Sequence, residues 1–381
     1  MFLSKIEGSP SLEVVNLVLE KLSKGEKVLS LAIGDPSSDT PRDIVDAAYS
    51  SMISGQVHYV PSSGIREVRE AIRAKVLRTN GIKASLDETI FLTTKLSVYA
   101  ALVALAESEF EALVPDPGYF YSEPVVLAGG QPVRYKLHPD FSLDLDEIKR
   151  KTTANTKAIL VNSPSNPTGK VSGKSELKEL YEFCQEKQIY IVSDEAYEDL
   201  TYEGTKHFAV GSLESSPELV ISLFSLSKSY SMTGWRAGYL IAPRQIGHSI
   251  NKFLENTLTC LPPFIQKASE YALNSGDRYI QFFRKEYSEK RKLVQDSLAD
   301  TPGLELNNVE GAFYGFPKLK RWSASSVEFA KILLHSENVA ILPGSAFGPS
   351  GEGRIRISFS GKTQDLTEGL ERIKKFSASF S

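Results

Sequence analysis

Short apolar runs alternate with stretches of helical periodicity between Ser85 and Arg244, and this alternation strongly limits how the chain can fold. Lys95–Ala106 and Ser175–Lys187 are two of the helical stretches. The apolar runs between such stretches are continuous, which is typical of parallel strands buried on both faces. We therefore expect an α/β fold in which a mostly parallel sheet is flanked by helices.

The chain is long enough for more than one hydrophobic core. Its 381 residues exceed the size at which a single core usually stops growing. After residue 275 the pattern changes to a long amphipathic helix, followed by short strand and helix candidates. We expect a large domain over residues 41–275 and a smaller α+β domain over residues 276–381.

One segment combines a lysine with groups that suit a phosphate. The apolar run Leu219–Phe224 ends in Ser225 and Ser227, Lys228 follows, and Arg236 lies eight positions further on. A lysine amine forms an imine with an aldehyde once its pKa is lowered, and hydroxyls, backbone N–H groups and an arginine bind phosphate. Pyridoxal phosphate is both an aldehyde and a phosphate, so it fits this combination. Taken alone, the segment leaves open a solvated turn lysine and an arginine in a surface salt bridge.

Two further apolar runs upstream also end in polar residues. Asn166 follows the run Ala158–Val161, and Asp194 and Tyr197 follow the run Ile189–Val192. Open α/β sheets bind ligands beyond the carboxyl ends of their strands. There a carboxylate would keep a pyridine nitrogen protonated, and the amide and the phenol could donate hydrogen bonds to the ring's phenolate oxygen. A helix cap and an Asx turn are the ordinary alternatives, but three such strand ends together favour one cofactor site.

These motifs together resemble the fold-type I, pyridoxal-phosphate-dependent aminotransferases of class I/II, the aspartate and alanine aminotransferase kind. The resemblance extends from Leu31–Pro36 to Arg354–Phe359, and the Ser-x-Ser-Lys segment and the Asn-Pro-x-Gly motif at Asn166–Gly169 are its most specific parts. It implies that residues 1–40 form an N-terminal arm that joins the small domain. It also implies a homodimer with shared active sites.

The resemblance assigns a role to each polar residue at the strand ends. Lys228 would be the Schiff-base lysine that also moves the proton, Asp194 the partner of the pyridinium, and Asn166 and Tyr197 the partners of the phenolate. The side chains implied to hold the phosphate are Ser225, Ser227 and Arg236.

Other positions match the family pattern less closely. Thr94 and Lys95 stand where the family opens a helix whose N–H groups face the phosphate, although many relatives have glycines there. Close backbone approach is then less free, but the Thr94 hydroxyl could donate to the phosphate instead. Tyr119 matches the aromatic residue that stacks on the pyridine ring, with an ordinary half-buried aromatic as the alternative. Tyr59 matches the tyrosine that reaches the phosphate of the neighbouring subunit.

The substrate carboxylate has its own implied contacts. Gly34 matches the glycine beside that carboxylate, and Asn166 is also expected to contact the substrate. Arg356 matches the arginine that binds the carboxylate. The alternative for Arg356 is the solvated face of a strand whose apolar residues point inward. If the strand is covered on both sides, a buried arginine needs an anionic partner.

The expected activity is transamination between an L-amino acid and a 2-oxo acid such as 2-oxoglutarate, with aspartate as the first donor to test. Alanine, aromatic or other amino acids are alternative donors, and a C–S lyase of the same fold is an alternative reaction. Acidic donors would favour a second cation, and Asn256–Thr259, the part of the chain where a partner subunit would supply one, holds no arginine. A regulator that senses the cofactor is disfavoured, because residues 1–34 leave no room for a helix-turn-helix module.

Composition excludes several other classes. The net charge of −3 argues against a nucleic-acid surface, and no apolar run approaches the roughly 20 residues of a membrane span. The N-terminus lacks the apolar stretch of a secretory signal, so we expect a cytoplasmic protein. Cys184 and Cys260 lie far apart and indicate no disulfide framework. The five histidines show no ligand spacing, so no metal is expected.

Overall fold

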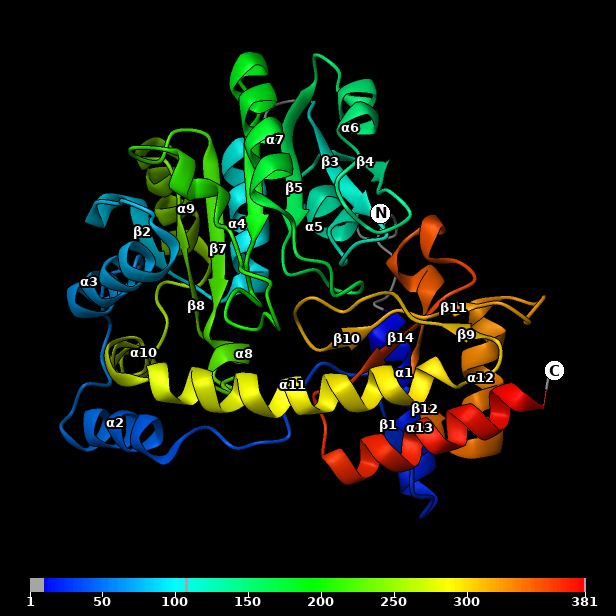
Figure 1. Cartoon of the computed structure of the whole chain (residues 1–381). Helices are drawn as coiled ribbons and strands as arrows, with labels where there is room; N and C mark the ends of the chain where they lie inside the picture. Colours follow the sequence, from blue (N-terminus) through cyan, green and yellow to red (C-terminus); the bar gives the residue numbers. More distant parts are fainter. Residues whose placement is uncertain (1–9, 107–108, 380–381) are drawn as a thin grey trace.

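The computed structural model describes residues 10–106 and 109–379, and a seven-stranded sheet forms its centre (Figure 1). The strand order is β2–β8–β7–β6–β5–β3–β4. Only β8 runs antiparallel to its neighbours, so the expected mostly parallel sheet of an α/β fold is confirmed. The strands are β2 (Thr89–Phe91), β3 (Glu111–Asp116), β4 (Gln131–Lys136), β5 (Thr156–Asn162), β6 (Tyr190–Asp194), β7 (Val220–Ser225) and β8 (Gly238–Ile241).

Helices cover both faces of this sheet (Figure 1). Alternate residues of β5 show why its sequence is continuously apolar: Leu160 packs into one core, and Ile159 and Val161 pack into another. The first core includes residues of α4 (Thr94–Leu105), α5 (Ser122–Leu127) and α9 (Arg244–Thr257). The opposite face is covered by α2 (Arg42–Ile53), α3 (Arg66–Lys75), α6 (Leu145–Lys151), α7 (Lys174–Lys187) and α10 (Pro263–Ser275).

Three small sheets form the rest of the structure. β1 (Leu29–Ser30) pairs with β12 (Val339–Ala340), so an N-terminal segment lies among C-terminal strands. Another sheet has the order β10–β14–β13, and in the third β9 pairs with β11. The long helix α11 extends from the region of α10 and the short helix α8 (Leu226–Ser229) to these sheets (Figure 1). Besides β1 and β12, the helices and strands of this part of the structure are α1 (Pro10–Ser23), α11 (Asp277–Ala299), β9 (Leu304–Glu305), β10 (Tyr314–Gly315), β11 (Lys318–Leu319), α12 (Ser326–Glu337), β13 (Leu342–Pro343), β14 (Ile355–Ser358) and α13 (Thr363–Ala378).

The strand register explains where polar residues gather. Asn162 at the end of β5 pairs with Asp194 at the end of β6, and Asp194 pairs with Leu223 of β7. The carboxyl ends of these three strands therefore meet at one edge of the sheet.

The division into domains at about residues 40 and 275 stays a prediction. Over the described residues, no helix has the length and apolar character needed to cross a bilayer.

Candidate active site

Lys228 lies directly after β7, in the short helix α8 (Leu226–Ser229). Its Nζ donates a 2.6 Å hydrogen bond to the carbonyl of Gly34 and lies 5.5 Å from the centre of the Phe313 ring. Burial lowers the pKa of this amine to about 8, and the positive charges of Arg356 and Arg236 act in the same direction. The neutral, nucleophilic form of the amine is therefore accessible near neutral pH.

Asp194 ends β6 and is buried. Its Oδ2 accepts a 2.7 Å hydrogen bond from the hydroxyl of Tyr121, and its Oδ1 accepts one of 3.1 Å from the backbone N–H of Ala196. Burial raises the pKa of Asp194 to about 6, although both hydrogen bonds favour the carboxylate. The sequence analysis missed Tyr121, because a tyrosine at the start of a helix gave no sign that it faces a carboxylate.

Tyr197 is joined to a second residue that the sequence analysis missed. Its hydroxyl oxygen lies 2.8 Å from that of Tyr314, which comes from β10 of the small sheets. The Tyr314 hydroxyl also explains the glycine at position 34, since a Cβ atom there would overlap the hydroxyl oxygen. The amine of Lys228 therefore lies beside a connected group of residues, Gly34, Tyr314 and Tyr197.

Arg356 is buried, with 3% of its surface exposed. Its Nη1 donates a 3.0 Å hydrogen bond to Oδ1 of Asn166, and its Nη2 donates to the carbonyl of Ala32. The guanidinium lies 4.4 Å from the centre of the Tyr314 ring and 4.9 Å from that of Phe347, while Nε has no hydrogen-bond partner among the residues that the structure describes. Within residues 10–106 and 109–379, no aspartate or glutamate forms an ion pair with Arg356. The structure thus brings Arg356 and Asn166 together, and in the described part of the chain the charge of Arg356 lacks a protein anion.

The side chains expected to hold the phosphate meet between α8 and the start of α4. The hydroxyl of Ser225 caps α8 by accepting a 3.2 Å hydrogen bond from the N–H of Ser227. Arg236 has a left-handed backbone with φ of 58°, and its Nη2 donates a 3.4 Å hydrogen bond to the hydroxyl of Thr93. A non-glycine residue in this conformation is uncommon and is often found at functional sites.

The hydroxyl of Thr94, which the sequence suggested could donate to the phosphate, donates elsewhere in the structure. Its hydroxyl donates a 2.8 Å hydrogen bond to the carbonyl of Phe224, so this proton is already used within the protein. Thr94 and Lys95 begin α4, and the N–H groups of a first helical turn have no intrahelical partner. The backbone of this turn therefore remains suited to an anion, rather than the hydroxyl proton.

Tyr119 lies near residues at the strand ends, whereas Tyr59 is exposed on the surface. Tyr119 is half-buried with its ring centre 5.5 Å from that of Tyr121, and burial raises its pKa to about 12. Tyr59 is 88% exposed. The structure thus brings Tyr119 close to Tyr121 and Asp194, whereas Tyr59 lies exposed on the surface.

The sequence matches the family model for aminotransferase class I and II over residues 26–373. The chain belongs to the class I and II aminotransferases. It is 38% identical to an aspartate aminotransferase of Pyrococcus abyssi over 355 residues, which cover 91% of each chain. It is 37% identical to aromatic-amino-acid aminotransferase 2 of Thermococcus litoralis over 96% of this chain and 97% of that one. A structure of Thermus thermophilus aspartate aminotransferase with maleate superimposes with a TM-score of 0.94 at 31% identity, covering 98% of both chains.

Membership of the family confirms the predicted reaction class. This aminotransferase transfers an amino group between an amino acid and a 2-oxo acid, as the sequence motifs indicated. Relatives of similar identity carry both aspartate and aromatic-amino-acid names.

Proposed function

We propose that the chain is a pyridoxal-phosphate-dependent aminotransferase with aspartate as amino donor and 2-oxoglutarate as acceptor. The buried guanidinium of Arg356 carries this proposal. A buried charge without a partner anion is costly, and a substrate carboxylate would supply that anion. The planar guanidinium can offer two parallel N–H groups to a carboxylate, which a lysine cannot do.

The residues at the strand ends fit pyridoxal phosphate. Lys228 provides an amine of lowered pKa whose hydrogen bond goes to the carbonyl of Gly34 and not to a carboxylate. Asp194 provides a buried carboxylate whose charge needs a cation, and the ring nitrogen of the cofactor can supply one. Bound there, the cofactor would supply an electron sink for the bond between the substrate Cα and its hydrogen.

Each side chain then has a defined task. Lys228 would hold the cofactor and afterwards carry the proton taken from the substrate Cα. Asn166 and Tyr197 would donate to the phenolate oxygen, and Arg356 would orient the substrate so that its Cα proton faces the lysine. The groups proposed to hold the phosphate are Ser225, Ser227, Arg236 and the N–H groups of Thr94 and Lys95. Tyr119 would stack on the ring, and Gly34 would leave room beside the carboxylate.

A donor screen tests the proposed substrates. Purified protein loaded with pyridoxal phosphate would be assayed with individual L-amino acids and 2-oxoglutarate, and the glutamate formed would be measured. Aspartate should give the highest kcat/KM. An aromatic or alanine preference would overturn the donor, and release of pyruvate and ammonia from cysteine or cystathionine without glutamate formation would favour the C–S lyase alternative.

The exposed position of Tyr59 supports a homodimer. Apolar side chains gather near it on the surface, with Tyr49 and Ile53 on α2 and Val57 in the following loop all more than half exposed. A second copy covering this surface would bury them and would bring each Tyr59 to the other copy's phosphate site. Sedimentation of the purified protein tests this assembly, and a monomer would contradict it.

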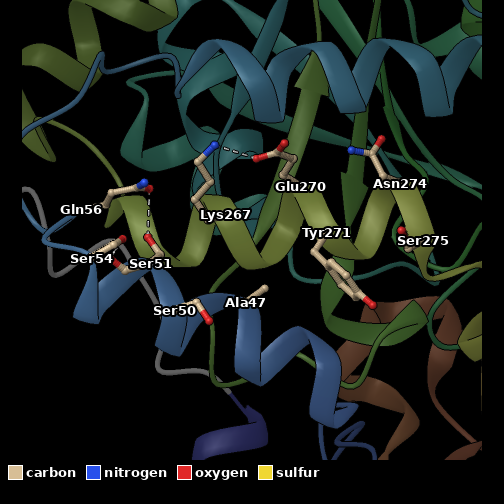
Figure 2. Close-up of a pocket in the computed structure, with 10 residues that line it drawn as sticks. All are labelled: Ala47, Ser50, Ser51, Ser54, Gln56, Lys267, Glu270, Tyr271, Asn274 and Ser275. Atoms are coloured by element: carbon tan, nitrogen blue, oxygen red, sulfur yellow. Dashed lines mark hydrogen bonds and ion pairs between the residues drawn. The ribbon is translucent and has the colours of Figure 1, made fainter.

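A groove of about 530 Å³ lies next to this surface, between α2 and α10 (Figure 2). Most of the residues that line it have polar side chains, and the ammonium group of Lys267 lies 3.0 Å from the carboxylate of Glu270. None of the residues assigned to the cofactor or the substrate carboxylate lines it. We therefore place the chemistry at the strand ends and not in this groove.

A further inference from the structure

Asp116 at the end of β3 is a buried carboxylate with partners in the C-terminal part of the chain. It is 4% exposed, and a carboxylate so deeply buried must be hydrogen-bonded. The N–H of Ser350 donates to its Oδ1 at 3.0 Å, and the hydroxyl of Ser350 donates to its Oδ2 at 2.9 Å. Ser350 lies in the 3-10 turn Pro349–Gly351, just before β14. This contact therefore joins the large sheet to the loop that leads to Arg356.

Gly348 makes the close approach possible. A Cβ atom at this position would overlap Oδ1 of Asp116 and would lie 2.9 Å from Nη1 of Arg134. Gly348 also has a φ of 116°, which L side chains rarely adopt. Any larger residue at position 348 would therefore separate Ser350 from Asp116.

The loop that carries Ser350 is fixed to its own surroundings. The backbones of Gly344 and Gly351 are in direct contact, since a Cβ atom on either would overlap the other's carbonyl oxygen. The carboxylate of Glu352 accepts hydrogen bonds of 2.7 Å and 2.9 Å from the N–H and the hydroxyl of Ser326. These contacts fix the loop to itself and to the start of α12, so a displacement of Ser350 would also displace its neighbours.

Phe347 connects this loop with the substrate site. Its ring stacks on that of Phe120 with centres 5.3 Å apart, and its carbonyl accepts a 2.9 Å hydrogen bond from the N–H of Gly118. The same ring lies 4.9 Å from the guanidinium of Arg356. The end of β3 and the residues just after it thus contact this loop at Ser350, through Asp116, and at Phe347, through Gly118 and Phe120.

We propose that Asp116 is a positioning residue for substrate binding. Through its two hydrogen bonds to Ser350 it fixes Phe347 against the guanidinium of Arg356. The planar guanidinium is thereby held against two aromatic rings and ready for a carboxylate. This inference rests on the proposed role of Arg356, and it adds a determinant of carboxylate affinity that does not itself touch the substrate.

Single substitutions on both sides of the contact test the inference. Asp116→Ala and Gly348→Ala would be compared with the wild-type holoenzyme for kcat, for the KM values of the best donor and the oxo-acid acceptor, and for the dissociation constant of pyridoxal phosphate. Both variants should raise both KM values about tenfold, with a smaller fall in kcat. Cofactor affinity should stay within about twofold, because the phosphate and ring contacts are elsewhere. The exposed hydroxyl of Ser336 serves as control, and Ser336→Ala should change nothing.

Two further variants keep the test decisive. The double variant Asp116→Ala, Gly348→Ala should be no worse than either single variant, because both changes break the same contact. Ser350→Ala removes one hydroxyl and should raise KM about two- to fivefold, and it decides the matter if Asp116→Ala does not fold.

The inference fails if KM is unchanged in these variants or if cofactor affinity falls in step with KM. Arg356→Lys separates this from the proposed function. If that variant raises KM while the Asp116 and Ser350 variants do not, only the positioning role is wrong. If Arg356→Lys also leaves KM unchanged, the assignment of the carboxylate site is wrong.

Discussion

The Tyr121 hydroxyl donates a 2.7 Å hydrogen bond to Oδ2 of Asp194, and both groups are buried. The bond stabilises the carboxylate, yet burial outweighs it and raises the pKa of Asp194 to about 6. In the protein freed of cofactor, this carboxylate therefore carries a charge that nothing nearby balances fully.

Asp194→Asn should make the cofactor-free protein less sensitive to pH. The pKa of Asp194 is higher in the folded state than the ordinary value of 3.8, so the folded state holds the proton more tightly. The wild type should consequently lose ~3 kcal/mol of unfolding free energy as pH rises from about 4 to 6, and the variant should not. Urea denaturation across this range measures the difference, and parallel curves for the two proteins would contradict it.

In the enzyme loaded with cofactor, Asp194→Asn should slow the reaction. An amide cannot keep the ring nitrogen protonated, so removal of the Cα proton should slow while cofactor binding weakens. A Cα-deuterated donor would then show a larger kinetic isotope effect in the variant. An unchanged isotope effect and unchanged kcat would separate Asp194 from the ring nitrogen.

Lys228→Ala should lose nearly all transamination. Removing a positioned proton carrier alone costs ~10²–10⁴-fold in rate, and the variant also loses the attachment point of the cofactor. Borohydride reduction followed by peptide mapping should find the cofactor on Lys228 in the wild type and on no residue in the variant. Lys83→Ala, at an exposed lysine, is the control. Label on another lysine would show that the assignment is wrong.

The lowered pKa of Lys228 adds a pH dependence. The amine reacts in its neutral form, whose share rises as pH increases through about 8. The rate at which cofactor-free protein captures pyridoxal phosphate should therefore increase over this range and then level off. Stopped-flow absorbance measures this rate, and a rise centred near 10.5 would indicate an ordinary exposed lysine.

The sequence alone predicted the residues at the strand ends because their chemistry is visible locally. An apolar run followed by Asp194, or by Ser225 and Lys228, predicts both a buried strand and the polar group at its end. Arg356 was assigned by resemblance, and the structure brings its side chain to 3.0 Å from that of Asn166, which was predicted from its place after an apolar run.

The residues that were missed depend on contacts between distant segments. Tyr121 lies 73 positions from Asp194, and Tyr314 lies 117 positions from Tyr197. The sequence neighbours of a tyrosine do not indicate whether its hydroxyl contacts a backbone carbonyl or an active-site group. The Thr94 hydroxyl was assigned to the phosphate for a related reason, because nothing in its own segment shows that the Phe224 carbonyl lies 2.8 Å away.

Arg356→Lys should keep cofactor binding and weaken every carboxylate substrate. A lysine cannot form the two parallel bonds of a guanidinium, and charge-assisted bonds are worth ~1.5–3 kcal/mol each. KM should rise for all amino and oxo acids alike, and kcat should fall because the substrate is less well oriented. Arg354→Lys is a matched control, since Arg354 lies two residues earlier and points to Asn307 and the Phe316 carbonyl. A defect confined to one substrate would move Arg356 to the side-chain pocket.

Mixed dimers should reveal whether Tyr59 serves the other subunit. Chains with Tyr59→Phe would be combined with chains carrying Lys228→Ala. If Tyr59 crosses, one site of the mixed dimer contains both changes and the other contains neither. The mixed dimer should then show half of the wild-type activity, with cofactor affinity intact at its active site. Weakened affinity at the one site that retains Lys228 would place Tyr59 in its own chain's site.

Lys75→Met should destabilise the protein strongly. Lys75 and Glu198 form an ion pair in which both side chains are almost fully buried, and Lys75 also donates a 3.2 Å hydrogen bond to Asn80. Removing the cation leaves a buried carboxylate uncompensated, at a cost of ~3–5 kcal/mol in unfolding free energy. Lys24→Met is the matched control, because its pair with Glu20 is exposed and should have little effect. Equal midpoints in urea for both variants would contradict the prediction.

The hydrogen bond from Lys228 to the Gly34 carbonyl has a consequence for biogenesis. The segment around Gly34 is held by strands from the other end of the chain, since the N–H of Ser358 donates a 2.8 Å hydrogen bond to the carbonyl of Leu31. A nascent chain on the ribosome can therefore form the central sheet and expose Lys228 well before this partner is in place. The Gly34 carbonyl can take its place beside Lys228 only after Ser358 has been synthesised and released, which makes completion of this contact a late, essentially post-translational event.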